Sequence, residues 1–120
     1  MTKYQNSKHY DLEERTLKFS KEIIKLAKLL PKSIINIKLT NQIIRSGTSM
    51  GANYREANET ETKKDFNFRI RICRKEGKET IYWLLLILEA NPDCEKMIRP
   101  LIQEATELVK IFAAIAAKSK

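Results

Sequence analysis

The chain has few of the residues that build metal sites, disulfide frameworks or nucleophilic catalytic sites. Its 120 residues include two cysteines and one histidine. Cys73 and Cys94 lack the spacing of a zinc or redox motif. His9 precedes the first predicted helix, so neither a dinuclear carboxylate centre nor a Ser or Cys nucleophile has a helical histidine beside it. We therefore expect no metal, no cofactor and no enzymatic activity.

Long hydrophobic runs are also absent. The longest, residues 81–88, has eight apolar residues, too few to cross a bilayer. The first ten residues are polar and include two lysines, unlike a signal segment. Together with the absence of a disulfide pattern, these features predict a cytoplasmic protein with reduced thiols and no membrane partner.

Positive charge is abundant and unevenly distributed. The formal net charge is +8. Residues 1–32 hold eight Lys/Arg against four Asp/Glu, and residues 33–79 hold ten against six, whereas residues 80–120 hold five of each. Such an asymmetry favours an anionic partner, RNA or DNA, over a uniformly basic surface. A solvated lysine-rich face is the alternative.

Apolar or small residues recur at steps of four and three in four segments, which predicts four helices. Asp11 and Glu14 resemble a capping box at the first helix, after a flexible tail of residues 1–10, and Pro31 follows its end. The second helix is expected to begin between residues 36 and 40, and the third after Thr62. The fourth is expected to begin near residues 91–92, with Pro100 either kinking it or marking its first turn.

No alternating run bounded by turn signals predicts a strand, so the fold class is all-α. Short connections between long helices favour an antiparallel up-down-up-down four-helix bundle over residues 11–118. Two features suggest self-association. Leu17 and Ile24 form a second apolar row on the first helix, and residues 81–88 are apolar on all sides. On this interpretation Trp83→Asp or Ile87→Glu should dissociate the assembly and leave the helices intact.

The three glycines lie at helical positions, where each costs about 1 kcal/mol relative to alanine. They are Gly47, Gly51 and Gly77. Close packing of helices would offset this cost. A rival interpretation makes residues 46–51 a phosphate-binding loop, although the lysine and the preceding strand of a P-loop are missing.

A basic run over residues 69–78 is the candidate binding site. Four of its cations fall at i, i+3, i+4 and i+7 and would share one helix face: Arg71, Arg74, Lys75 and Lys78. Such a row can follow a phosphate backbone without reading sequence. The predicted outer members of this surface are Lys63, Lys64, Arg69 and Arg55. Alternatively, pairs at i,i+4 spacing, Lys75 with Glu79 and Arg69 with Asp65, would neutralise part of the run.

Two other groups of residues have candidate roles. Arg45 is expected to form a partly buried ion pair with Glu76 or Glu79 and so to set the register of two helices. Aromatic rings stack on bases where they are exposed. Tyr82 is a candidate for such stacking, whereas Tyr54 and Trp83 are expected to lie in the core or an interface.

Several stretches of the sequence resemble one known family. They are residues 43–57 (IIRSGTSMGANYREA), 63–66 (KKDF) and 79–84 (ETIYWL), with residues 11–16 and 108–120 fitting the same pattern. The chain resembles the four-helix-bundle proteins called 23S rRNA intervening-sequence proteins over about residues 10–120. Gly77 is a departure, because alanine is expected there in relatives, and it would loosen the third helix.

The resemblance implies an antiparallel bundle that assembles as a homopentamer around a central pore, with no established enzymatic activity. Some members are encoded inside insertions in large-subunit rRNA genes. A similar bundle assists a reverse transcriptase and engages nucleic acid in diversity-generating retroelements. We therefore expect a non-catalytic RNA-binding or RNA-accessory protein, or alternatively a scaffold for a partner enzyme such as a reverse transcriptase.

Overall fold

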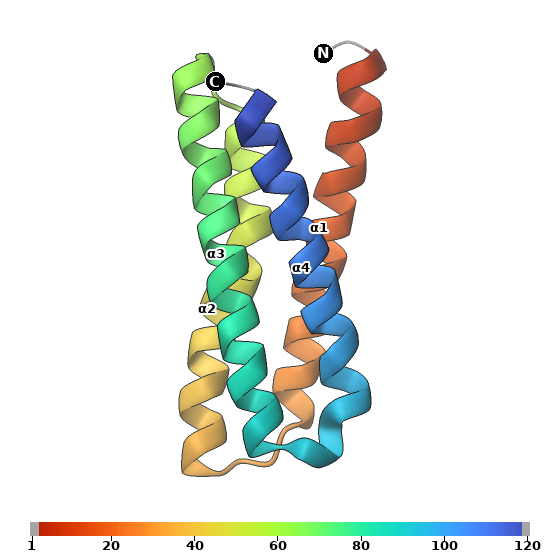
Figure 1. Ribbon diagram of the computed structural model, residues 1–120, viewed down its shortest axis with the longest axis vertical. Coiled ribbons are helices and arrows are strands. Elements are labelled where there is room, and N and C mark those ends of the chain that lie inside the picture. Colours follow the sequence, from red (N-terminus) through yellow and green to blue (C-terminus); the bar gives the residue numbers. More distant parts are fainter. Residues whose placement is uncertain (1–2, 119–120) are drawn as a thin grey trace.

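Four long helices make up the computed structural model, which describes the backbone of residues 3–118 and the side chains of residues 11–118. They are α1 (Lys3–Leu29), α2 (Ile34–Asn58), α3 (Lys63–Ala90) and α4 (Glu95–Lys118), with a 3-10 turn, η1 (Pro92–Cys94), before α4. No strand occurs in the described part of the chain. Successive helices run in opposite directions, as Figure 1 shows, which confirms the all-α fold class and the predicted order.

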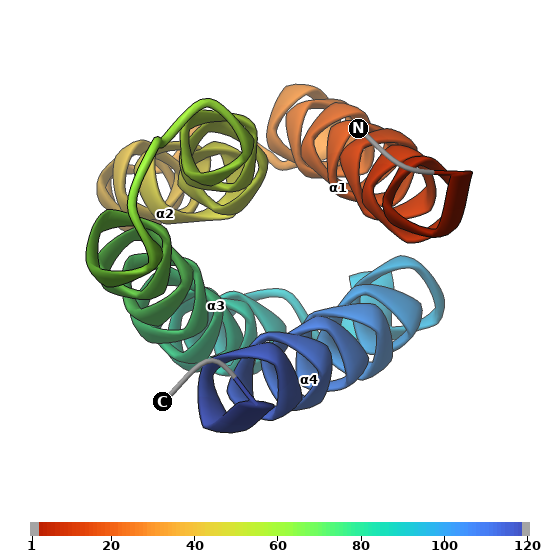
Figure 2. The same cartoon turned by 90° about the horizontal axis from the view of Figure 1, so that it is seen from above.

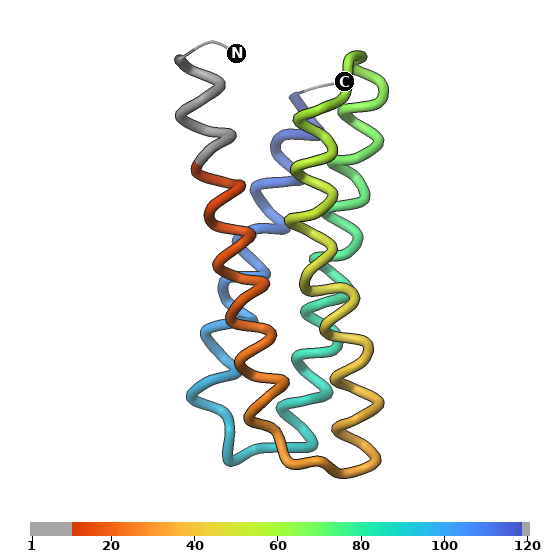
Figure 3. Tube along the Cα trace, turned by 180° about the vertical axis from the view of Figure 1, so that it is seen from behind, coloured from red at the N-terminus to blue at the C-terminus, as the bar shows by residue number. Residues whose placement is uncertain are grey.

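The helices follow one another around the bundle, so each packs against its neighbours in sequence (Figure 2). α1 packs mainly against α2, and its smaller contact with α4 completes the four-helix bundle. The α1–α2 and α3–α4 connections lie at the same end of the molecule (Figure 3). The α2–α3 connection therefore lies alone at the opposite end.

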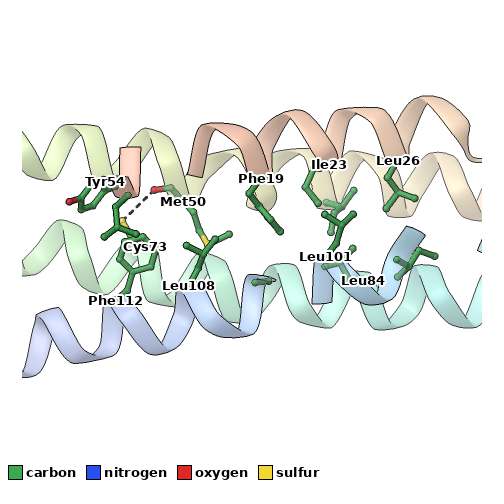
Figure 4. Packing of buried hydrophobic residues seen from close by; sticks show 14 of the residues in the cluster. Phe19, Ile23, Leu26, Met50, Tyr54, Cys73, Leu84, Leu101, Leu108 and Phe112 are labelled. Carbon is green, nitrogen blue, oxygen red and sulfur yellow. Dashed lines mark hydrogen bonds between the residues drawn. The ribbon is translucent and has the colours of Figure 1, made fainter. Parts of the chain in front are cut away.

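The core runs the length of the bundle between the four helices (Figure 4). Ile23 and Leu26 from α1 face Leu84 and Leu101 in one part of the core, and Tyr54 packs on Phe112 in another, with ring centroids 5.8 Å apart. These residues lie in the predicted helices at the steps of four and three described above. Burial of such stripes is the main source of stability in a bundle of this kind.

Side-chain caps start α2 and α3. The Ser33 hydroxyl accepts a hydrogen bond from the Asn36 amide at 3.0 Å, and the Thr62 hydroxyl accepts one from the Asp65 amide at 3.0 Å. The predicted start of α3 is confirmed. α2 begins at Ile34, two residues before the predicted window, because Ser33 caps the helix. The apolar pattern alone does not reveal this cap.

The starts of α1 and α4 require correction. α1 begins at Lys3, so Asp11 and Glu14 lie inside the helix and do not cap it. The predicted tail of residues 1–10 is thus helical from residue 3; residues 1–2 and the side chain of His9 lie outside the description. The 3-10 turn η1 begins at Pro92 and α4 begins at Glu95. Pro100 therefore lies inside α4 and does not mark its first turn. No helix of the described chain is long and apolar enough to cross a membrane.

The glycines of α2 lie where α1 and α2 approach closely. A Cβ at Gly47 would lie 3.0 Å from Ile23 Cγ1, and one at Gly51 would lie 3.0 Å from Thr16 Oγ1. Both glycines are inside α2. The phosphate-binding loop over residues 46–51 is therefore wrong, because those residues continue the helix and their missing side chains make room for α1.

Gly77 serves the same purpose between α3 and α4. A Cβ there would lie 2.6 Å from Val109 Cγ2 and 3.0 Å from Met50 Sδ. The structure thus gives this glycine the close-packing role that we predicted for all three glycines, and not the loosening of α3 that we expected from its departure from relatives.

Several large apolar side chains remain exposed. On α1 and α2 they include Leu17, Ile24, Ile37 and Ile44, and on α3 they include Phe68, Tyr82 and Leu85. Ile87, in contrast, is fully buried. The expectation that Ile87→Glu would only dissociate an assembly is wrong, because this side chain lies within the core of a single chain.

Candidate nucleic-acid interface

The four cations of the predicted row all point into solvent along α3. Arg71, Arg74, Lys75 and Lys78 are exposed, and none of them forms an ion pair with any residue that the structure describes. Because α3 rises about 1.5 Å per residue, the row from Arg71 to Lys78 is roughly 10 Å long. Four unpaired positive charges over this length form a strong local electrostatic attraction for an anion.

The row stays unpaired because its nearest acid is engaged elsewhere. Glu79, one turn after Lys75, accepts a hydrogen bond from Arg45 of α2. Arg69 does not pair with Asp65; its Nη1 donates to Asn53 Oδ1 at 3.1 Å. The two neutralising pairs that the i,i+4 spacing suggested are therefore absent from this structure, and the charge of the row is not offset by its own helix.

Arg45 joins α2 to α3 as the sequence suggested. Its Nη1 lies 3.2 Å from Glu76 Oε1, and its second Nη group bonds to Glu79. The hydrogen bond with Glu79 and the two nearby carboxylates raise the pKa of Arg45. Next to this pair, the Thr80 hydroxyl donates to the Glu76 carbonyl oxygen at 2.7 Å and is hydrogen-bonded to the Ser46 hydroxyl at 3.0 Å inside the seam. These contacts fix how α3 is rotated, and hence which side of it faces solvent.

The predicted outer members do not all share this surface. Lys64 is exposed and lies seven residues before Arg71, which places it on the same face, and Lys63 is exposed beside it. Arg69 faces α2 through its bond to Asn53. Arg55 lies 3.5 Å from Glu13 at the contact between α1 and α2. Arg69 and Arg55 thus belong to helix contacts away from the row.

Aromatic exposure separates the three candidate stacking residues. Tyr54 is buried, and burial raises its pKa to about 12. Trp83 is half-buried, while Tyr82 beside it is 55% exposed. Phe68, which sequence reasoning missed, is 59% exposed. Its position four residues after Lys64 and three before Arg71 was the available signal.

A second group of lysines on α1 was also missed. Lys18, Lys21, Lys25 and Lys28 are exposed at helical spacing. Lys25 pairs with Glu22 at 3.3 Å, so this group is interrupted by an acid. Unlike the row on α3, this group contains no arginine, and no described aromatic residue of α1 is exposed beside it. It is therefore the weaker candidate and a natural control.

The titratable groups inside the bundle are held by packing or by ion pairs. Burial raises the pKa of the Cys73 thiol to about 12, and its sulfur lies 3.4 Å from the Met50 carbonyl oxygen in the core. Arg15 bridges α1 and α4 through Glu104 at 2.7 Å and Glu107 at 2.9 Å, and the hydrogen bond with Glu104 raises its pKa. Among the described residues, no group of three or more His, Cys, Asp or Glu side chains is arranged to hold a metal ion.

Fold and surface together define a small basic four-helix-bundle protein with an unpaired cationic row on its third helix. Residues 8–114 match the family model of the 23S rRNA-intervening sequence protein, and the chain belongs to this family. Its solved structural neighbours include a protein of unknown function from the S23 ribosomal protein family of Bacteroides thetaiotaomicron. That protein is 33% identical, with a TM-score of 0.79, over 87% of this chain and 96% of its own. A search of curated proteins found no match.

Proposed function

We propose that the protein is a non-catalytic nucleic-acid-binding protein that contacts RNA through the α3 cations. The observation that carries this proposal is the row of four exposed cations, Arg71, Arg74, Lys75 and Lys78, with no acidic partner in the described structure. When such a row neutralises phosphates, counterions are released from the nucleic acid, and this release favours binding. A surface with equal numbers of positive and negative charges lacks this effect. The resemblance to this family, some of whose members are encoded inside insertions in rRNA genes, is the ground on which we choose RNA over DNA as the ligand.

The chemistry of the row favours backbone contact over sequence readout. Arginine can hold a phosphate with two parallel hydrogen bonds, and lysine adds a mobile point charge. A length of about 10 Å corresponds to roughly three phosphate steps along one strand of a duplex. We therefore expect affinity to depend on charge and on the shape of the nucleic acid.

We further propose that the chain assembles into a homo-oligomeric ring of five subunits, as the family resemblance implies. Exposed apolar side chains on α1 and α2, such as Ile24 and Ile44, support association. A ring would repeat the α3 row in every subunit. Simultaneous contacts with one RNA would then raise the avidity above the affinity of a single row.

The test is a salt series with nucleic-acid-free protein, an RNA fragment and a DNA duplex of equal length. The variant Arg71→Gln, Arg74→Gln, Lys75→Gln, Lys78→Gln should weaken binding to every sequence. It should also reduce the slope of log affinity against log salt, by about 0.7–0.9 for each lost phosphate contact. Preference for RNA over DNA would identify RNA as the ligand.

The matched control replaces four exposed lysines away from the row by glutamine: Lys18, Lys21, Lys28 and Lys38. It lowers net charge by the same amount. If the control weakens binding as much as the α3 variant, net charge or the α1 lysines contribute as much to the affinity as this face does. Unchanged binding by the α3 variant would rule out the row as the site.

A second candidate function is a scaffold for a partner enzyme, such as a reverse transcriptase, with no direct role for nucleic acid. The exposed apolar side chains on α1 and α2 favour it, because they suit a protein contact better than a phosphate backbone. Absence of nucleic-acid binding at low salt, together with retention of a purified reverse transcriptase by the wild type, would support this function.

A further inference from the structure

Two exposed aromatic rings continue the cation row at both of its ends. Steps of four and three along α3 define a single line of exposed side chains: Lys64, Phe68, Arg71, Lys75, Lys78 and Tyr82. Residues at these steps lie on one face of a helix. Arg74 lies next to the line, and no acidic residue occupies a position in it. We refer to these six side chains as the α3 line.

Phe68 extends from this line into solvent. Its ring is 59% exposed; its neighbours one turn away along the line are Lys64 and Arg71, and Asp65 and Ile72 lie one turn away beside the line. A single exposed aromatic ring is unremarkable on most surfaces. Between cations, however, a flat ring provides the stacking surface that proteins use for unpaired bases.

Tyr82 is supported from one side. Its ring lies edge-on to Trp83, with centroids 5.2 Å apart and an interplanar angle of 70°. Trp83 packs against the hydrophobic core, which restrains it. Tyr82 is nevertheless 55% exposed. A ring that is held in place yet open to solvent loses little conformational entropy when a base stacks on it.

We propose that the α3 line binds single-stranded nucleic acid, with phosphates on its cations and bases stacked on Phe68 and Tyr82. This inference rests on the function proposed above and adds the class of ligand. The two rings are fourteen residues apart, roughly 21 Å along the helix axis, with the cations between them. Bases inside a duplex are stacked on each other and closed to side chains, so only an unpaired strand uses both parts of the line.

The experiment compares three probes by fluorescence anisotropy at one salt concentration. They are an unstructured RNA strand, the same strand paired with its complement, and an abasic strand with the same number of phosphates. The wild type should bind the unpaired strand most tightly. Phe68→Ala and Tyr82→Ala should each weaken this binding between about 5-fold and about 150-fold, and should leave binding of the duplex and the abasic strand unchanged.

Two further sets of variants serve as controls. Phe68→Trp and Tyr82→Phe retain a stacking ring and should keep most of the affinity for the unpaired strand. Leu29→Ala removes an exposed apolar side chain at the end of α1 and should have no effect. Sedimentation of each variant checks the oligomeric state, because loss of assembly on replacing Phe68 or Tyr82 would place these rings in a subunit contact and overturn the inference.

The result also separates this inference from the proposed function. Equal affinity for duplex and unpaired strand, with alanine variants like the wild type, would overturn the stacking role while the quadruple cation variant still lost affinity. Failure of the wild type to bind all three probes would overturn both. Selective loss of unpaired-strand binding in the two alanine variants is the outcome that the α3 line predicts.

Discussion

At Gly77, the absence of one methyl group determines how closely α3 and α4 can approach. Val109 Cγ2 occupies the space where a Cβ would be, 2.6 Å from its ideal position. Val109 is β-branched and has little freedom to rotate away, whereas the neighbouring Met50 is flexible. The sequence predicted close packing at the glycines of α2 correctly, but it could not show that Val109 fills the space at Gly77, because the two residues are far apart in the chain.

We expect Gly77→Ala to destabilise the bundle despite the better helix propensity of alanine. The gain in propensity is about 1 kcal/mol, and the overlap with Val109 should cost about 1–3 kcal/mol. Urea denaturation should therefore show a net loss of about 1 kcal/mol in the free energy of unfolding. In the double variant Gly77→Ala, Val109→Ala, part of the overlap is removed, so the effect of Gly77→Ala should be smaller in the Val109→Ala background. A clear stabilisation by Gly77→Ala alone would contradict this account.

Among the elements, most of each helix and the start of α3 were predictable, whereas the starts of α1 and α2 were not. The heptad stripes predicted which faces of α1 to α4 are buried, because each stripe must meet another inside the bundle. The start of α1 was misplaced because a cap-like pattern at Asp11 is also compatible with a helix that has already begun. The cation row on α3 was predictable from spacing, whereas its lack of pairing depends on Arg45 of α2, a partner that local spacing cannot weigh against Lys75.

The end of the bundle with the α1–α2 and α3–α4 connections contains a buried pair of asparagine amides that links α2 to the end of α3. Asn36 Nδ2 donates to Asn91 Oδ1 at 2.9 Å, and Asn91 Nδ2 donates to Asn36 Oδ1 at 2.8 Å. The same two amide groups donate to the carbonyl oxygens of Pro31 and Ile87. The pair thus ties the α1–α2 connection and the start of α2 to the end of α3, where heptad patterns carry no information.

Replacing one asparagine of this pair should destabilise the protein by more than the loss of its own hydrogen bonds, because the other asparagine stays buried without its partner. Asn91→Ala leaves the Asn36 amide without its buried partner, and we expect a loss of about 1–3 kcal/mol in the free energy of unfolding. The double variant Asn36→Leu, Asn91→Leu removes both polar groups and should cost less than the sum of the two single leucine replacements. Thermal and urea unfolding would measure both effects; strictly additive losses would show that the two amides act independently.

For the whole molecule, the monomer leaves apolar surface that its own four helices do not cover. Leu17 and Ile24 flank Ser20 on α1, and the hydroxyl of Ser20 lies 3.4 Å from the Gly47 carbonyl oxygen on α2. Ile44 precedes Gly47 by one turn, and Ile37 lies a further two turns back. These four side chains therefore lie beside the α1–α2 seam. The sequence identified the α1 half of this surface, but only the packed pair of helices shows that α2 extends it.

We expect this surface to mediate self-association. Wild-type protein should sediment as an oligomer, and a ring of five 14.0 kDa chains would have a mass of about 70 kDa. Ile24→Glu, Ile44→Glu should shift the protein toward the monomer because it places two charges in an apolar contact, and circular dichroism should show unchanged helix content because both side chains are exposed. Leu29→Glu adds a charge at a more exposed position away from the seam and should leave the oligomer intact. A monomeric wild type at micromolar concentration would contradict association. An oligomeric double variant would place the subunit contact on another face, and the exposed apolar side chains of α3 would then be among the candidates.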